Sequence, residues 1–425
     1  MKTLPYWTDR TPKPADVATP EPPSQADVVI IGAGITGLTA ARSIADQGKS
    51  AVVVDAMEVG QGASAINGGQ LNFGLKPSLA TLAKKFGPKK TQALWDTSLA
   101  AVDLAERIIE DEGFDADFRR TGAVSLGYHE ASREKAHATS RYLQDTYGFA
   151  TTVLEGGDLR AVIGSDRFTV ALVSEFDGAV DPTKYTYGLA TAVARRGVPI
   201  VEDCEVTGLS RSGAGHVVTT RKGTITAGDV LLATNGYTPK ELVPTVRRQI
   251  VPIGSYMVAT EPIDDETIDR LLPGDRVYWT QRRFLNYFRR SDDNRLLFGG
   301  RPNLSPDLSL TDVAGGMRSA IADIFPDLAG IGISHVWGGK LAASFDLLPH
   351  LGQTPDGVWY VVGYGGHGVG LATYLGTEVG GLIGGGVETS PWLGMPHPTR
   401  FYYRGDPWFL TPGSLVFRAL DRLGR

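Results

Sequence analysis

The fold is decided by residues 27–37, which read DVVIIGAGITG. Residues 28–31 form a short continuous apolar run, the pattern of a strand buried on both faces. After the glycine-rich turn, a helical segment runs from Leu38 to about Gln47, and Gly48 suits its C-cap. Residues 51–54 (AVVV) are the next buried strand and lead into Asp55. This order of strand, glycine turn, helix and strand predicts the start of a Rossmann-like α/β domain.

The pattern G-x-G-x-x-G occurs twice, at residues 32–37 and at residues 363–368. In a chain with 53 glycines among 425 residues, roughly 0.8 such matches are expected by chance, so the structural context has to decide. The first match lies between a strand and a helix, where the backbone can approach a pyrophosphate at the positive end of the helix. Asp55 ends the next strand and can accept hydrogen bonds from ribose hydroxyls. We therefore place a dinucleotide at the first match.

The second match follows the apolar strand 358–362 and precedes a helix, but no strand-end acid follows it. It is a poor dinucleotide site. Backbone N–H groups at such a helix start can instead stabilise a developing negative charge on a bound ring. A plain helix start packed on a sheet is the alternative.

Composition excludes several classes of protein. The net charge of −5 gives no reason to expect nucleic acid. Cys204 is the only cysteine and the seven histidines show no close ligand spacing, so neither a disulfide nor a metal site is expected. Residues 1–25 lack the apolar core of a signal peptide and are expected to form an extended arm, which makes a cytoplasmic location the default. Residues 368–387 are apolar enough to be weighed as a membrane span, but their glycines, threonines and Glu378 favour a buried helix, so no transmembrane segment is expected.

Further elements follow from periodicity. Residues 91–147 are mostly helical in pattern, interrupted by a strand-like run at 119–128. A helix at 184–196, a strand at 198–201 and a strand at 230–233 continue the α/β pattern. Residues 248–301 alternate and carry many aromatic side chains, which predicts an antiparallel sheet.

Four segments together resemble the FAD-dependent D-amino-acid-oxidase superfamily: 28–55, 62–70 (GASAINGGQ), 233–236 (ATNG) and 337–370. They follow the family's order over nearly the whole chain, which is more specific than any one motif. The branch that the chain most resembles is that of gamma-glutamylputrescine oxidoreductase, in which residues 5–7 (PYW) and 406–410 (DPWFL) also fit.

The resemblance implies a Rossmann-like FAD/NAD(P)-binding domain made of discontinuous pieces and a second, α+β substrate domain built on an antiparallel sheet. The boundaries we predict are an arm at 1–25, FAD-binding parts at 26–88, 154–244 and 336–390, substrate parts at 89–153 and 245–335, and a tail at 391–425. For Val206, a backbone contact with adenine and an ordinary strand position are both open. The cofactor-binding residues predicted in this way are Gly32, Ala33, Gly34, Ile35, Thr36, Gly37, Asp55, Ala56, Gly62, Ala63, Ser64, Asn67, Gly68, Gly69, Gln70, Val206, Thr234, Asn235, Gly236, Gly363, Tyr364, Gly365, Gly366, His367, Gly368 and Val369.

Two departures from the family pattern matter. Members with covalent flavin use a cysteine near the C-terminal glycine loop or a histidine near the N-terminal one, and neither is present here, so we expect non-covalent FAD. Sarcosine-oxidase relatives place an oxygen-activating lysine on a strand that corresponds to residues 295–300, which contain no lysine. The electron acceptor, O₂ or another molecule, therefore stays open.

Oxidation of an amine by flavin requires the neutral nitrogen, so the pocket must disfavour the ammonium form by desolvation. Candidate aromatic walls are Tyr256, Tyr278, Trp279, Tyr287, Trp337 and Phe345, each of which could equally be a core residue. A substrate carboxylate calls for an arginine fork, for which Arg301 is preferred, with Arg282 and Arg283 behind it. His367 could tune the flavin or make a structural hydrogen bond, and Lys340 could reach the flavin or lie at the surface. The predicted catalytic set is Arg301, Tyr256, Trp337, His367 and Lys340.

The expected activity is hydride transfer from a small amine or amino acid, such as a gamma-glutamylputrescine-like compound or an N-alkyl amino acid, to FAD, giving an imine that hydrolyses. Two alternatives stay open: an FAD dehydrogenase of a hydroxy acid or polyol phosphate, and a flavin-binding subunit of a hetero-complex in which the aromatic tail 392–417 makes the contact. An assembly of identical chains is also compatible with the sequence.

Overall fold

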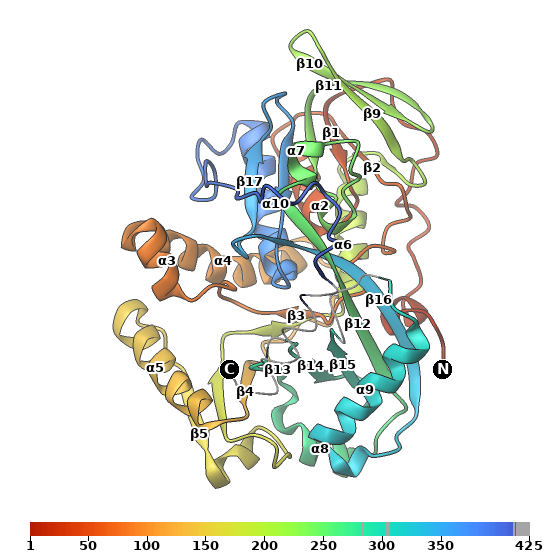
Figure 1. Ribbon diagram of the computed structural model, residues 1–425. Helices are drawn as coiled ribbons and strands as arrows, with labels where there is room; N and C mark the ends of the chain where they lie inside the picture. The colour runs from red at the N-terminus through yellow and green to blue at the C-terminus, as the bar shows by residue number, and fades with distance from the viewer. Residues whose placement is uncertain (283, 302–306, 411–412, 414–425) are drawn as a thin grey trace.

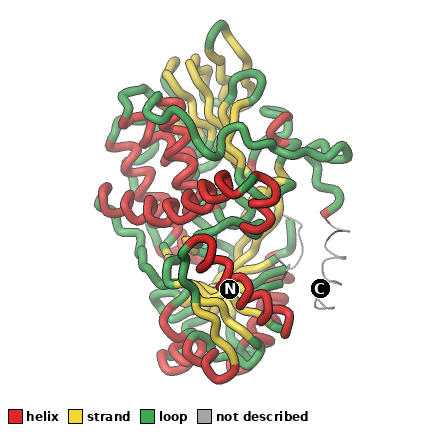
Figure 2. Tube along the Cα trace, turned by 90° about the vertical axis from the view of Figure 1, so that its left-hand side faces the viewer, coloured by secondary structure: helices red, strands yellow, loops and turns green. Residues whose placement is uncertain are grey.

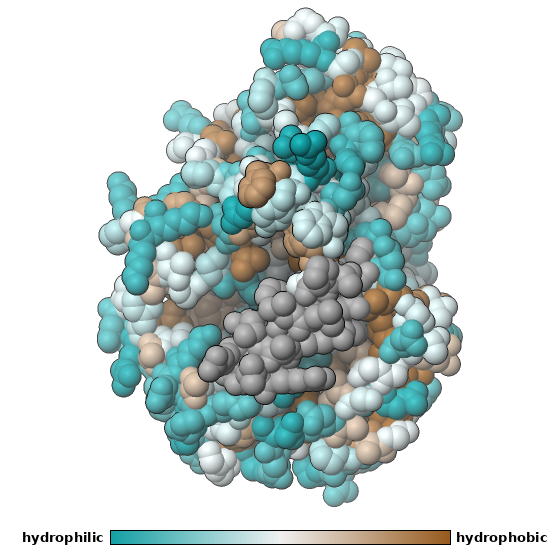
Figure 3. All heavy atoms as spheres, viewed as in Figure 1, coloured by the Kyte–Doolittle hydropathy of each residue, from teal (hydrophilic) through white to brown (hydrophobic). Residues whose placement is uncertain are grey.

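The computed structural model describes residues 1–282, 284–301, 307–410 and 413. The chain forms two lobes, each built on its own eight-stranded sheet (Figure 1). The two-stranded sheet of Gln70–Leu71 (β3) and Gly178–Ala179 (β7) lies between the lobes in Figure 1. On the face shown in Figure 3, hydrophobic side chains occur in small groups among hydrophilic ones.

The first lobe contains a parallel sheet, as the apolar runs predicted. Its central order is β17-β18-β11-β1-β2-β8, in which all neighbours are parallel except β17 and β18, and the hairpin β9-β10 continues from β11. Its strands are Gln25–Ile31 (β1), Ala51–Val54 (β2), Ile200–Val201 (β8), Val206–Ser212 (β9), Gly215–Thr220 (β10), Gly223–Leu232 (β11), His350–Gln353 (β17) and Trp359–Val362 (β18). The strand–turn–helix–strand start predicted from residues 27–55 is confirmed.

Helices lie beside this sheet (Figure 2), and two of them contact each other at glycine residues. They are α2 (Ile35–Asp46) and α10 (Gly368–Gly384). A Cβ atom on Gly376 would lie 2.1 Å from the Thr39 hydroxyl, and one on Gly380 would lie 2.6 Å from the Ala40 carbonyl oxygen. The glycines of the 368–387 segment therefore allow close packing of two helices. Among the described residues, no helix is long and apolar enough to span a membrane.

The second lobe contains the sheet β16-β12-β15-β14-β13-β4-β6-β5, which is antiparallel except between β13 and β4. The prediction of an antiparallel sheet in residues 248–301 is confirmed. Its strands are Ala123–Gly127 (β4), Thr152–Glu155 (β5), Val170–Ser174 (β6), Ile250–Thr260 (β12), Val277–Thr280 (β13), Tyr287–Arg290 (β14), Leu296–Gly300 (β15) and Ile333–Ser344 (β16). Because β6 folds back on β4 and buries Val170 and Val173, the predicted FAD-binding part 154–244 also contributes to this second lobe.

The remaining helices are α1 (Tyr6–Arg10), α3 (Leu79–Phe86), α4 (Pro88–Glu112), α5 (Glu130–Tyr147), α6 (Pro182–Arg195), α7 (Pro244–Arg247), α8 (Asp265–Leu271) and α9 (Leu310–Ile324). Four short 3₁₀ segments are also described, at Gly156–Ala161 (η1), Asn235–Tyr237 (η2), Pro273–Asp275 (η3) and Pro326–Leu328 (η4).

The N-terminal segment departs in part from the extended arm that the sequence predicted, since residues 11–24 contain no helix or strand but the residues before them do. Residues 6–10 form a helical turn, and the Tyr6 and Trp7 side chains are buried in a cluster with Trp337. The Trp7 indole N–H donates to the Asn67 carbonyl oxygen at 2.9 Å. Burial of two large aromatic rings explains why the segment is docked.

The described part of the C-terminal tail packs on its own chain. Trp392 and Tyr403 are fully buried, and the Tyr403 hydroxyl donates to the Ile250 carbonyl oxygen at 2.7 Å. Phe401 and Trp408 remain 92% and 65% exposed. Residues 411–412 and 414–425 of the predicted tail lie outside the described part.

Candidate active site

A cavity of about 470 Å³ runs between the two lobes. One half, which we call the dinucleotide half, is lined by the first glycine turn, Asp55, the start of β9 and the end of β11. The other half, which we call the substrate half, is lined by β12, the β13–β15 region, β16 and the second glycine loop. The first half lies at the carboxyl ends of parallel strands, the position at which α/β sheets bind ligands.

The first glycine turn is shaped for close approach. Gly32 has φ of +115°, and a Cβ atom on Gly37 would lie 1.9 Å from the Gly32 carbonyl oxygen. Only glycine therefore lets α2 start this close to the strand. The Ile35 N–H at the start of the helix donates to the Ser64 hydroxyl at 3.0 Å, which ties the turn to the 62–70 loop. The helix N-terminus faces the cavity and provides partial positive charge for a phosphate group.

Asp55 stands at the end of β2, as the motif requires. Its Oδ2 accepts from the Ala33 N–H at 2.7 Å and its Oδ1 accepts from the Met57 N–H at 2.9 Å. Burial raises the pKa of this carboxyl above its ordinary value. Each carboxylate oxygen has further acceptor capacity, so both can still receive a ribose hydroxyl.

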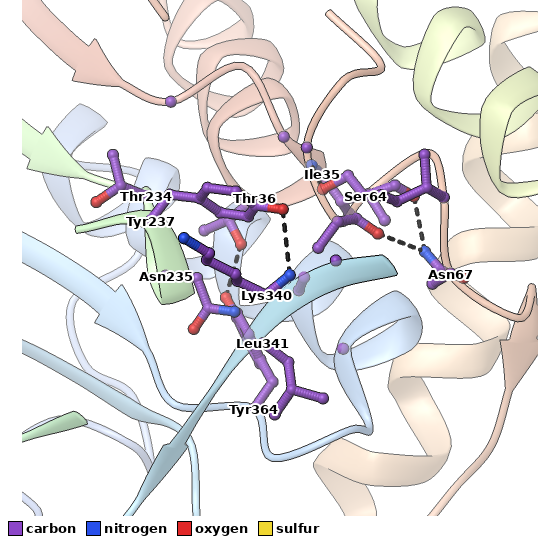
Figure 4. A pocket seen from close by; sticks show the side chains of 18 of the residues that line it. Ile35, Thr36, Ser64, Asn67, Thr234, Asn235, Tyr237, Lys340, Leu341 and Tyr364 are labelled. Atoms are coloured by element: carbon purple, nitrogen blue, oxygen red, sulfur yellow. Dashed lines mark hydrogen bonds between the residues drawn. The ribbon is translucent and has the colours of Figure 1, made fainter. Parts of the chain in front are cut away.

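The 62–70 loop is held rigidly beside the cavity. The Asn67 side chain donates to the carbonyl oxygens of Ser64 (Figure 4) and Ala63, and accepts from the Gly69 N–H at 2.8 Å. The Trp337 indole N–H donates to the Ile66 carbonyl oxygen at 2.7 Å. Both amide hydrogens of Asn67 are thus bonded within its own loop. This leaves backbone groups, the Ser64 hydroxyl and the Gln70 side chain as the loop's contribution to a ligand.

The second glycine loop is connected to both the first turn and the end of β11. The Gly363 N–H donates to the Asn235 Oδ1 at 3.0 Å, and the Gly365 N–H donates to the Ala342 carbonyl oxygen at 2.9 Å. The Tyr364 hydroxyl lies 2.7 Å from the Thr36 hydroxyl on α2 (Figure 4). The two glycine-rich segments, more than 300 residues apart in sequence, therefore form one cavity wall.

Most of the predicted cofactor-binding residues line the cavity. Those that line it are Gly32, Gly34, Ile35, Thr36, Asp55, Ala56, Gly62, Ala63, Ser64, Asn67, Gly68, Gln70, Val206, Thr234, Asn235, Tyr364, Gly365, Gly366, His367, Gly368 and Val369. Those that do not line it are Ala33, Gly37, Gly69, Gly236 and Gly363.

The glycines that do not line the cavity have a packing reason to be glycine. A Cβ atom on Gly69 would lie 2.1 Å from the Val180 carbonyl oxygen, and one on Gly236 would lie 2.9 Å from the Leu341 carbonyl carbon. Glycine at these two positions allows two backbone segments to lie in contact behind the residues that line the cavity.

Four of the five predicted catalytic residues line the cavity: Arg301, Trp337, His367 and Lys340. Tyr256 does not. It lies on β12 between Ser255 and Met257, which do line the cavity, and side chains alternate along a strand. Its ring packs in the core of the second lobe and its hydroxyl accepts from the Leu308 N–H at 2.8 Å. The prediction that Tyr256 faces the substrate is therefore wrong.

Some of the other candidate residues line the cavity and others lie elsewhere. Trp279 and Tyr287 line the cavity, whereas Tyr278 stacks on Phe288 in the core and Phe345 packs against Tyr403. The Arg282 guanidinium stands over the Tyr128 ring, 3.7 Å from its centroid, and Arg283 lies outside the described residues.

Arg301 and His367 form the polar centre of the substrate half. Among the described residues, neither the Arg301 Nε nor the His367 Nδ1 has a hydrogen-bond partner, although both atoms are buried. Burial, together with the charges of Lys76 and Arg301, lowers the pKa of His367 to about 4, so the imidazole is neutral at neutral pH. Burial also lowers the pKa of Arg301, which remains charged. Buried polar atoms of this kind are normally satisfied by a ligand or by ordered water.

Lys76 is a cavity residue that sequence reasoning missed. It lines the cavity from the segment between β3 and α3, is solvent-exposed, and has no ion pair with any described residue. Desolvation and the charge of Arg301 lower its pKa to about 8. Its position next to the 62–70 motif was the only sequence signal that could have identified it. Tyr237 was also missed, and its hydroxyl accepts from the Lys340 N–H at 3.2 Å (Figure 4).

Known proteins match this chain over most of its length. The profile of a family described as FAD dependent oxidoreductase (DAO) matches residues 27–382. Probable oxidoreductase OrdL from Haemophilus influenzae is 31% identical over 381 residues, which cover 88% of this chain and 87% of the relative. Gamma-glutamylputrescine oxidoreductase from Escherichia coli is 27% identical over 434 residues, which cover 99% of each chain. The solved structure of glycine oxidase from Geobacillus kaustophilus has a TM-score of 0.70 at 22% identity and covers 85% of this chain and 95% of its own.

Proposed function

This chain belongs to the family of FAD-dependent oxidoreductases, and from that premise we propose that it oxidises the C–N bond of a small amine or amino acid that carries a carboxylate. The family membership confirms the resemblance, the fold class and the FAD cofactor expected from the sequence. A gamma-glutamylputrescine-like compound or an N-alkyl amino acid fits the proposal.

The residues of this chain fit FAD. The 32–37 turn, where a Cβ at position 37 would meet backbone, and Asp55 would hold the pyrophosphate and the ribose of the adenosine half. The 62–70 loop and the 363–369 loop would hold the ring end. Cys204 lines the dinucleotide half of the cavity, and the 60–70 loop contains no histidine, which supports non-covalent FAD. When bound, FAD supplies a hydride acceptor for the carbon beside the substrate nitrogen.

The observation that carries the proposal is the Arg301 guanidinium in the substrate half of the cavity, for which the described residues provide no ion-pair partner. No acid among the described residues lies within ion-pair distance of it, and its Nε is buried without a partner. A planar guanidinium in such a place binds a carboxylate through two parallel hydrogen bonds. It would fix the substrate's orientation while Trp279, Tyr287 and Met257 exclude water around the reacting carbon.

The positive charge of the site also favours the protonation state that amine oxidation requires. Hydride leaves only from the neutral amine, because the nitrogen lone pair drives it off the adjacent carbon. The positive charges of Arg301 and Lys76 lower the pKa of a bound amine and therefore favour its neutral form. His367 stays neutral in the same field and offers Nδ1 for a hydrogen bond to a ligand. The imine product then hydrolyses to a carbonyl compound and an amine or ammonia.

Anaerobic mixing with a panel of secondary amines, N-methyl amino acids, acylated diamines and 2-hydroxy acids tests the proposal. We expect loss of the visible flavin absorbance with carboxylated amines. Arg301→Lys, which keeps the charge and loses the planar fork, should raise the KM for these amines by about 10- to 100-fold, as expected for the loss of a charged hydrogen bond. Flavin that no amine or amino acid bleaches would refute the proposal, and turnover of hydroxy acids alone would select a hydroxy-acid dehydrogenase.

The electron acceptor is part of the same proposal. Leu296, Leu297 and Phe298 of β15 are all buried and apolar. Comparing O₂ consumption with reduction of an artificial dye, at equal substrate concentration, distinguishes an oxidase from a dehydrogenase.

A further inference from the structure

The charged side chains that line the cavity are separated by sign. The acids among the described lining residues are Asp55 and Glu205, and both belong to the dinucleotide half. The basic side chains are Lys76, Arg301 and Lys340, in the substrate half. The Lys340 ammonium lies 4.0 Å from Asp307, which leaves Lys76 and Arg301 as the two cations to be explained.

These two cations reach the cavity from different segments. Arg301 follows β15 in the second lobe, and Lys76 lies between β3 and α3. Both line the same cavity as His367, and the charge of each lowers the pKa of that imidazole. Neither has an ion pair with any described residue, and the neighbouring segment 302–306 reads PNLSP and contains no acid.

We propose that Lys76 forms a second anion subsite and that the substrate is an amine with two acidic groups, one bound by Arg301 and the other by Lys76. Lys76 is solvent-exposed at the cavity, so a monocarboxylate bound by Arg301 leaves this ammonium paired only with water, and a second acidic group on the same ligand gains a charge-assisted contact there. A dianionic ligand pairs both. A substrate whose distal end is an ammonium group, as in a simple diamine, is disfavoured by like-charge repulsion at Lys76.

This inference rests on the proposed oxidation of an amine, and the experiment separates the two. Ligands are N-methylglycine, with one carboxylate, and a series of N-carboxyalkyl glycines with a second carboxylate at one, two or three methylene groups from the nitrogen. The dissociation constants come from anaerobic flavin difference spectra and from the substrate dependence of flavin reduction in stopped flow. The proteins are wild type, Lys76→Met, Lys76→Arg and the control Lys84→Met, which removes an exposed lysine on α3.

We expect the best dicarboxylate to bind wild type at least tenfold more tightly than N-methylglycine, as a charge-assisted contact predicts. Lys76→Met should abolish this ratio, Lys76→Arg should retain most of it, and Lys84→Met should leave it intact. A wild-type ratio near one, or an equal loss for both ligand classes in Lys76→Met, would overturn the second subsite. Reduction by monocarboxylic amines with an unchanged ratio in Lys76→Met refutes the second subsite alone, whereas flavin that no amine reduces refutes the proposed function itself.

Discussion

Replacing Gly37 with alanine should separate α2 from the turn that precedes it. The new Cβ would lie 1.9 Å from the Gly32 carbonyl oxygen, whereas real Cβ atoms essentially never come within 3.0 Å of a heavy atom. Because the obstacle is backbone, no side-chain rotation can relieve it. The helix start must move by at least about 1 Å, and the N–H groups that face the phosphate site move with it.

Two effects of measurable size follow. Overpacking of this kind destabilises a protein by about 1–3 kcal/mol. Misplacing a charge-assisted hydrogen bond to the pyrophosphate costs about 1.5–3 kcal/mol, which corresponds to a rise of about 10- to 150-fold in the Kd for FAD. The second effect is specific to the cofactor and is absent from a change elsewhere in the fold.

Titration of the apoprotein with FAD measures the Kd, and urea unfolding of the apoprotein and the holoprotein measures the two stabilities. The matched control is Gly316→Ala on α9, where a Cβ atom meets nothing within 4 Å. Alanine is the better helix former, so this variant should gain about 0.5–1 kcal/mol and keep its FAD affinity. The same chemical change thus has opposite signs at two helical positions.

A folded Gly37→Ala variant that binds FAD within twofold of wild type would refute the close-approach reasoning. If that variant does not fold, Gly34→Ala answers the question. Its Cβ lies 2.7 Å from the Ser64 hydroxyl, which is a side-chain atom, so a smaller loss of FAD affinity is expected and Ser64→Ala should partly restore it. Failure of that rescue would contradict the assigned contact.

Three further predictions concern charge and cofactor attachment. Burial raises the pKa of Asp177 to about 7, so the folded state holds a proton that the unfolded state releases near pH 4, and stability falls as pH rises from about 4 to 7. Asp177→Asn should remove that slope and stabilise the protein at pH 8 by up to about 4 kcal/mol in urea unfolding; an unchanged slope would contradict a buried carboxylic acid. His397 stacks on His350 at 3.8 Å between ring centroids, and burial lowers its pKa to about 3, so its contribution to stability is complete above pH 6.5 and is lost as pH falls towards 3. His397→Phe keeps a stacked ring and should raise the unfolding free energy at pH 4.5 by up to about 3 kcal/mol relative to its effect at pH 8; equal effects at both pH values would show that folding does not lower the pKa of this histidine. Acid precipitation should leave the yellow colour in the supernatant, and a yellow pellet would mean covalent flavin.

How far the sequence predicts this fold depends on how local each signal is. Residues 27–55 identify β1, α2 and β2 because apolar periodicity, glycine turns and strand-end acids act over a few residues. The hairpin β9–β10 and the long strand β16 were not anticipated. Their partners, β11 and β12, are set by pairing across the sheet, and β-strand preferences depend strongly on such neighbours.

The candidate site likewise contains residues that local motifs predict and residues that only tertiary contacts place. Motif positions such as Asp55, Asn67 and Gly365 lie at the cavity because short segments place them there. Tyr256 was predicted there and points away, because its orientation depends on the register between β12 and β16. Lys76 was missed because nothing within its own segment shows that Arg301, 225 positions away, shares its cavity.

The sequence by itself determined the cofactor-binding half of this protein, the α/β class and the absence of cysteine and histidine at the places where flavin would be attached. Those features are encoded in contiguous residues, whose backbone geometry depends on their own side chains. Only the tertiary structure decided which face of each strand meets the substrate and which cations remain unpaired. Burial and charge pairing arise from contacts between segments hundreds of residues apart, and no local pattern records them.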